Sequence, residues 1–151
     1  MDYLTLKWLH VMSSTVLFGT GIGSAFFVFV ASVRRDRAAL TAATRTVVLA
    51  DWLFTAPAVV VQPLTGYWLA ALGGISPGRG WLLTAGLLYA LAIACWLPVV
   101  ALQLRMRTVM ATDSDGIPPA YWPLFRWWTV LGTIAFCCFI ALFRLMVLKR
   151  L

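Results

Sequence analysis

The first apolar stretch of the sequence carries His10, which is the only histidine of the chain. At helical spacing Lys7, Ser14 and Gly21 fall on the same side as His10. A neutral imidazole is a common ligand of iron and other metals, and a face of small residues lets a flat ligand or a neighbouring helix approach the backbone. The pattern predicts a metal- or cofactor-binding site in which His10 is the metal ligand, with helix packing as the alternative.

A cationic group is expected beside this histidine. Arg144 lies near the end of the last apolar run and, at a rise of about 1.5 Å per residue, reaches a depth similar to that of His10. Arg144, Lys7 and His10 gather positive potential with no acidic residue nearby. This combination predicts that the site holds an anionic group such as a carboxylate, although arginines near helix ends also extend toward water.

A polar stripe runs along the second apolar run. Its residues share one helical face and are Asp51, Thr55, Gln62 and Thr65. Polar side chains at membrane depth normally face the interior of a bundle, so the stripe is expected to meet polar residues of the other helices. Asp51 is expected to form an ion pair at the cytoplasmic end of the bundle, with an arginine from the set Arg34, Arg35, Arg105 and Arg126.

The composition of the chain indicates that membrane-spanning helices position these residues. The 151 residues are 62% hydrophobic and 11% charged, and the mean hydropathy is +0.91, which is typical of a chain embedded in a lipid bilayer. Four apolar runs, at about 4–33, 46–72, 81–104 and 121–148, are each long enough to span it. They predict an all-α polytopic membrane protein, a four-transmembrane-helix up-down bundle that forms a single domain over residues 1–151.

The basic residues predict an orientation. The net charge is +7, but most lysines and arginines flank the apolar runs, which suits lipid headgroups and argues against nucleic acid as a partner. Seven arginines belong to the first and third connections, and they are Arg34, Arg35, Arg37, Arg45, Arg105, Arg107 and Arg126. Lys7, Arg79, Lys149 and Arg150 lie on the other side. The positive-inside rule therefore places both termini outside.

Three segments carry a family resemblance. They read LKWLHVMSSTVLFGTGIGSAFF, VVLADWLFTAPAVVVQPLTGYWL and CWLPVVALQLRMR. Over nearly the whole chain they resemble the bacterial membrane family catalogued as domain of unknown function 2269. The resemblance implies a small multi-pass protein of the bacterial cytoplasmic membrane and assigns no activity.

The opening K-W-L-H pattern is also similar to the first helix of the small membrane protoporphyrinogen oxidase and of copper-resistance membrane proteins. In the oxidase family a histidine of this kind is associated with haem. By this similarity only His10 carries over, because the third run, 81–104, contains no lysine at the place where that family has one. The similarity implies b-type haem as a cofactor. If haem is bound, the positions of Arg144 and Lys7 predict that one of them pairs a propionate.

Three interpretations of function follow from these observations. In the first, the protein binds haem or a metal through His10 in a redox role. The second axial position is then open, filled by a methionine such as Met12, or supplied by a second copy of the chain. In the second, it is a small transporter that uses the polar stripe of Asp51, Thr55, Gln62 and Thr65. In the third, it is a structural or accessory subunit without a cofactor, within a homo-oligomer or a larger membrane complex.

Overall fold

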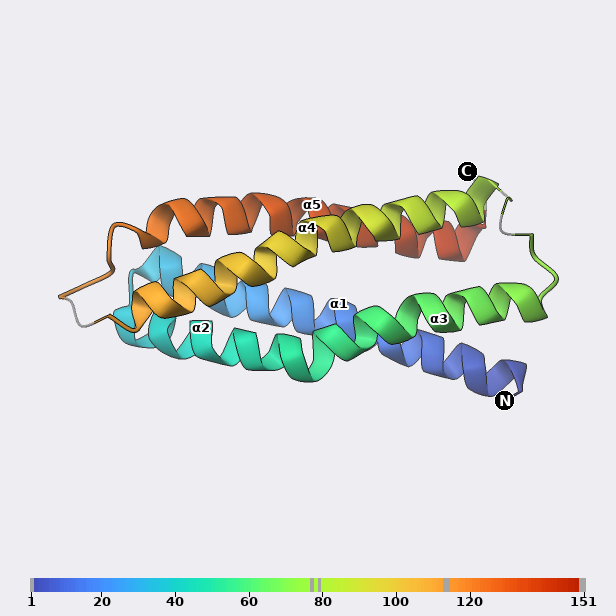
Figure 1. Cartoon of the computed structure of the whole chain (residues 1–151), viewed down its shortest axis with the longest axis horizontal. Coiled ribbons are helices and arrows are strands. Elements are labelled where there is room, and N and C mark those ends of the chain that lie inside the picture. Colours follow the sequence, from blue (N-terminus) through green and yellow to red (C-terminus); the bar gives the residue numbers. More distant parts are fainter. Residues whose placement is uncertain (1, 77, 79, 113–114, 150–151) are drawn as a thin grey trace.

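The protein is described by a computed structural model that covers residues 2–76, 78, 80–112 and 115–149. Its helices are α1 (Tyr3–Arg34), α2 (Arg37–Ala50), the π-helix η1 (Asp51–Thr55), α3 (Ala56–Leu72), α4 (Gly80–Met110) and α5 (Tyr121–Leu148). Because α2, η1 and α3 follow one another without a break, they form one long span. The predicted all-α bundle of four candidate membrane spans is confirmed (Figure 1).

The outer surface of this bundle is apolar. Between 22% and 28% of the most apolar window of each span is buried inside the bundle, and large side chains such as Phe27, Leu64 and Val147 are exposed. A surface of this kind is stable against lipid rather than water, and helices satisfy their own backbone hydrogen bonds there. Contact with a lipid bilayer follows.

The spans form two antiparallel pairs. α1 lies along the second span and α4 lies along α5, while α2 also contacts α4. The beginning of α1 and the end of α5 lie at the same end of the bundle, here named the terminal end (Figure 1). The α1–α2 turn and the α4–α5 connection lie at the opposite end.

The second span begins earlier than the hydropathy predicts. Arg35 ends α1 in a left-handed conformation with φ of 54°, and the Asp36 side chain caps α2 by accepting the backbone N–H of Ala39 at 2.9 Å. A capped, alanine-rich segment is a good helix former even where it is too polar to suit lipid. Arg37 and Arg45 therefore lie on α2, and the expectation that they belong to the first connection is wrong.

The π-helix has a cause in the next residues of the sequence. Pro57 has no N–H, and its ring presses against the carbonyl group four residues earlier when the backbone is strictly α-helical. Just before it the backbone widens, so that the N–H of Ala56 bonds the carbonyl of Asp51, five residues back. A π turn inserts one extra residue and rotates the following face, so η1 sets how α3 faces α1.

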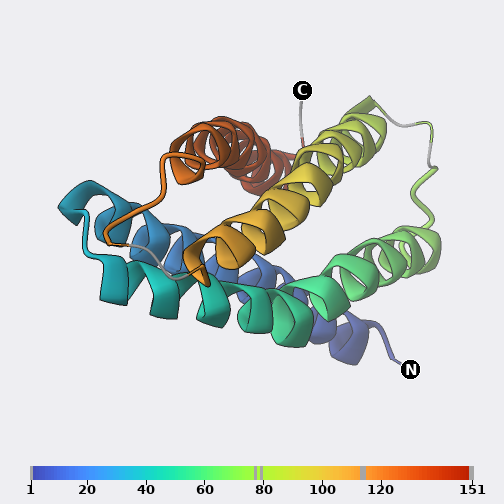
Figure 2. The same ribbon diagram turned by 60° about the vertical axis from the view of Figure 1, so that its left-hand side comes forward.

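The bundle is packed tightly at the opposite end and opens toward the terminal end. Val28, Leu40, Met106 and Tyr121 belong to the main apolar cluster there, and the hydroxyl group of Tyr121 lies 2.7 Å from Ser32 Oγ. From this end α4 leaves the second span and follows α5, so that α3 and α4 diverge (Figure 2). Cavities lie between the described helices within the bundle.

Candidate functional site

His10 faces the second span from α1. Its Nδ1 atom lies 2.8 Å from Thr65 Oγ1, and its Nε2 atom lies 3.1 Å from Gln62 Nε2. Thr65 is buried, and His10 and Gln62 are half-buried. The expectation that the polar face of α1 meets the polar stripe of the second span is confirmed at these residues.

The hydrogen bonds around His10 correspond to one tautomer of its ring. The Thr65 hydroxyl donates to the carbonyl group of Val61 at 2.8 Å, so its oxygen accepts from His10 Nδ1–H. The Ser13 hydroxyl contacts both the His10 carbonyl group and Gln62 Oε1. With Gln62 Oε1 facing Ser13, the amide nitrogen donates to His10 Nε2. In this arrangement the imidazole is neutral, with its lone pair on Nε2.

A cavity of about 490 Å³ lies beside this ring and is named the His10 cavity. Its lining includes His10, Ser14, Gln62, Gly66, Gly86 and Tyr89. A Cβ atom at Gly66 would lie 3.1 Å from His10 Cε1, whereas one at Gly86 would meet nothing within 4 Å. Glycine at 66 therefore lets the imidazole lie against α3, and glycine at 86 leaves open space on α4.

The structure separates the residues predicted to bind a cofactor. His10 and Ser14 line the His10 cavity, whereas Gly21 lines the second cavity, further along α1. Lys7 and Arg144 are exposed and line neither cavity. The glycines that adjoin the His10 cavity come instead from α3 and α4, which the spacing within α1 cannot reveal.

Tyr89 closes a gap in the backbone hydrogen bonding of α3. Pro63 has no N–H to donate to the carbonyl of Val59, four residues earlier. The Tyr89 hydroxyl donates to this same carbonyl at 2.6 Å. A side chain of α4 thus satisfies a carbonyl group that a proline leaves without its helical donor, as membrane helices require.

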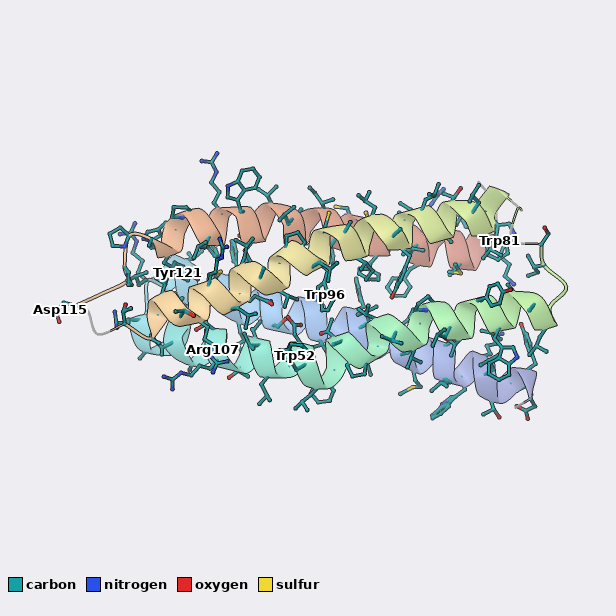
Figure 3. All side chains as sticks on the ribbon, viewed as in Figure 1. Trp52, Trp81, Trp96, Arg107, Asp115 and Tyr121 are labelled. Atoms are coloured by element: carbon teal, nitrogen blue, oxygen red, sulfur yellow. The ribbon has the colours of Figure 1, made fainter. Side chains whose placement is uncertain are left out.

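The second cavity, of about 440 Å³, is named the Asp51 cavity. Its lining includes Asp51, Gly21, Trp96, Gln103, Trp128 and Gly132, and Figure 3 shows Trp96 near the middle of the length of the bundle. Thr55 donates to Asp51 Oδ1 at 2.8 Å. The polar stripe is therefore divided. Asp51 and Thr55 line the Asp51 cavity, whereas Gln62 and Thr65 form hydrogen bonds with His10.

The predicted ion pair of Asp51 with an arginine is wrong. Among the described residues Asp51 Oδ2 has no hydrogen-bond partner, and Arg34, Arg35, Arg105 and Arg126 are all exposed. Gln103, rather than Arg105, lies beside the carboxyl group. Side chains two residues apart on a helix point in nearly opposite directions, so a buried Gln103 turns Arg105 outward.

Sequence reasoning missed Ser13, Gly66 and Trp128. Ser13 lies beside the predicted face of α1 rather than on it, yet it orients Gln62. The described residues contain no group of three or more histidine, cysteine or acidic side chains placed to hold a metal ion. His10 is the only histidine of the chain, so a second histidine ligand would have to come from another copy.

Comparison with known families matches residues 4–150 to a family described as "Predicted integral membrane protein (DUF2269)". No curated protein and no solved structure matches the chain.

Proposed function

The chain belongs to the DUF2269 family of predicted integral membrane proteins, and from this premise we propose that it binds b-type haem, or another metal, through His10 in the His10 cavity. Haem bound in this way supplies one-electron redox chemistry. His10 would supply a nitrogen ligand, Thr65 and Gln62 would hold its orientation, and the cavity would supply apolar surroundings.

The observation that carries the proposal is the tautomer of His10. Histidines that ligate metals commonly donate their other ring N–H to an oxygen, which fixes the ring and raises the basicity of the ligating nitrogen. Thr65 is that acceptor for Nδ1–H. The Nε2 lone pair is directed to Gln62, a neutral amide, so Nε2 is the ring nitrogen that would ligate a metal.

The surroundings of His10 also suit a flat apolar ligand. Gly66 and Gly86 line the cavity, and a side chain at either position would take up space next to the ring or the cavity. Lys7, one turn before His10 on α1, and Arg144 on α5 are exposed. We assign to these two residues the pairing of carboxylate groups of the ligand at the terminal end.

Absorption spectroscopy tests the proposal. Wild-type protein from haem-replete cells, purified in detergent, should show a Soret band that shifts on reduction, and His10→Ala should lose the band while keeping its helical circular dichroism. Thr65→Val should lower haem retention about 10- to 100-fold. Thr46→Val is the matched control, since Thr46 is exposed and its hydroxyl donates to the Ala42 carbonyl group of its own helix. Wild-type protein with neither Soret absorption nor bound metal would contradict the proposal.

A structural role is the second candidate, and the completeness of the network around His10 supports it. Both ring nitrogens have partners on α3, so the same contacts hold α1 against the second span. In this case His10→Ala lowers the midpoint of thermal unfolding without changing any absorption band. The two measurements on one variant distinguish the candidates.

We also propose that the terminal end faces outward across the bacterial cytoplasmic membrane. Arg34, Arg35 and Arg37 lie at the opposite end of the bundle (Figure 1), which fits a cytoplasmic location. A single cysteine in place of Asp2, in a background without the native cysteines, should react with an impermeant maleimide from the periplasm. A cysteine in place of Asp115 should not, and the reverse labelling would refute this orientation.

A further inference from the structure

The Asp51 cavity brings together three buried polar atoms that lack a partner. These atoms are Asp51 Oδ2, Gln103 Oε1 and Trp128 Nε1, and they are the only buried side-chain nitrogen or oxygen atoms of the described residues without a hydrogen bond. Their residues are only 5–6% exposed, and all three line the same cavity. Buried polar groups are normally hydrogen-bonded, so their concentration in one place indicates that a ligand supplies the missing partners.

The hydroxyl groups that line this cavity already donate hydrogen bonds within the protein. Thr55 donates to Asp51 Oδ1 at 2.8 Å. Thr129 and Thr133 each donate to the carbonyl group one turn earlier on α5. The buried atoms that remain without a partner are therefore two acceptors, one of them a carboxyl oxygen, and the indole donor of Trp128.

These atoms favour a cationic ligand. The Gln103 side chain lies within hydrogen-bonding reach of the Asp51 carboxyl group. Two oxygen atoms of this pair, Asp51 Oδ2 and Gln103 Oε1, still have no donor among the described residues. Among the described lining residues there is no lysine, arginine or histidine that supplies one. An ammonium group carries several N–H donors and a positive charge, so it can donate to both oxygens and compensate a buried carboxylate.

The rest of the cavity suits an apolar body attached to that ammonium group. Aromatic rings from three helices line it, and they are Phe18, Phe26, Phe29, Trp96, Phe136 and Phe139. Aromatic faces attract cations in addition to burying apolar surface. Phe26, Phe29 and Phe136 are also 61%, 47% and 42% exposed on the lipid-facing surface, so the cavity reaches the surface between α1 and α5.

We propose that the Asp51 cavity binds an apolar organic ammonium ion that enters from the lipid phase. The ammonium group donates to Asp51 Oδ2 and Gln103 Oε1, and the apolar body lies among the aromatic rings. His10 does not line this cavity, so the site is independent of the haem proposal.

Binding of 4-phenylbutylammonium to the detergent-purified protein, measured by isothermal titration calorimetry, tests the site. The wild type should bind one equivalent saturably, and Asp51→Asn should bind it at least about tenfold more weakly, because a charge-assisted hydrogen bond is lost. Asparagine keeps the oxygen that accepts from Thr55. Asp36→Asn is the matched control, since Asp36 is an exposed helix cap that asparagine replaces well, and its affinity should equal that of the wild type.

Two further measurements keep the test decisive. Gly132→Phe should abolish binding by filling the cavity without changing its charge, since a Cβ at Gly132 meets nothing within 4 Å. 4-Phenylbutanol, an uncharged analogue, should bind at least about tenfold more weakly than the amine. Equal affinity for amine and alcohol, unchanged affinity in Asp51→Asn or Gly132→Phe, or no saturable binding by the wild type would each overturn the proposal.

Discussion

The hydrogen bond between Tyr89 and the backbone of α3 should stabilise the bundle measurably. Tyr89→Phe removes the donor at 2.6 Å from the Val59 carbonyl, which Pro63 already deprives of its helical partner. Side-chain hydrogen bonds between membrane helices contribute roughly 0.6 kcal/mol on average and up to about 1.7 kcal/mol, while an unsatisfied buried carbonyl costs about 1–3 kcal/mol. We expect Tyr89→Phe to lower the free energy of unfolding by about 1–2 kcal/mol.

A double-mutant cycle with Pro63→Ala separates this bond from the packing of the ring. Alanine at 63 restores an N–H that can donate to Val59, and Pro63 is exposed, so the substitution meets no crowded core. In the Pro63→Ala background the cost of Tyr89→Phe should fall below about 0.5 kcal/mol. Detergent-denaturation curves followed by circular dichroism measure both values, with Tyr67→Phe, 70% exposed on α3, as the control. An equal cost of Tyr89→Phe in both backgrounds would refute the reasoning.

Two other contacts give predictions of the same kind. The Ser32 hydroxyl donates to the Val28 carbonyl at 2.6 Å, so Tyr121 is the donor in the 2.7 Å contact between the two hydroxyl groups. Tyr121→Phe should lower the free energy of unfolding by about 1–2 kcal/mol, and an unchanged denaturation midpoint would contradict this assignment. Gly86→Ala should raise stability by up to about 1 kcal/mol through helix propensity, since its Cβ enters open space. Gly66→Ala should not raise the stability, because the added Cβ would lie 3.1 Å from the His10 ring. Thermal unfolding measures both variants, and an equal gain in stability at both positions would show that this contact is unimportant.

The sequence alone determined the architecture and which faces turn inward. Four apolar runs are each long enough to cross the bilayer as a helix, and in lipid only helices and closed barrels satisfy the backbone hydrogen bonds. Four helical spans follow from these two facts. Helical periodicity then placed Asp51, Thr55 and Thr65 on one face, and all three are buried. Hydropathy alone gave too late a beginning for the second span, because the polar first turns of α2 are stabilised by the Asp36 cap and not by their apolar content.

The tertiary structure decided which residues of these faces meet. Periodicity gives the direction of a side chain around one helix, but not which neighbour stands opposite it or at what height. Those depend on the extra residue of η1 before Pro57, on the contact of α1 with α3, and on the divergence of α4 from α3 (Figure 2). Hence His10 meets Gln62 and Thr65, while Gly21, on the same face of α1, lines the cavity of Asp51.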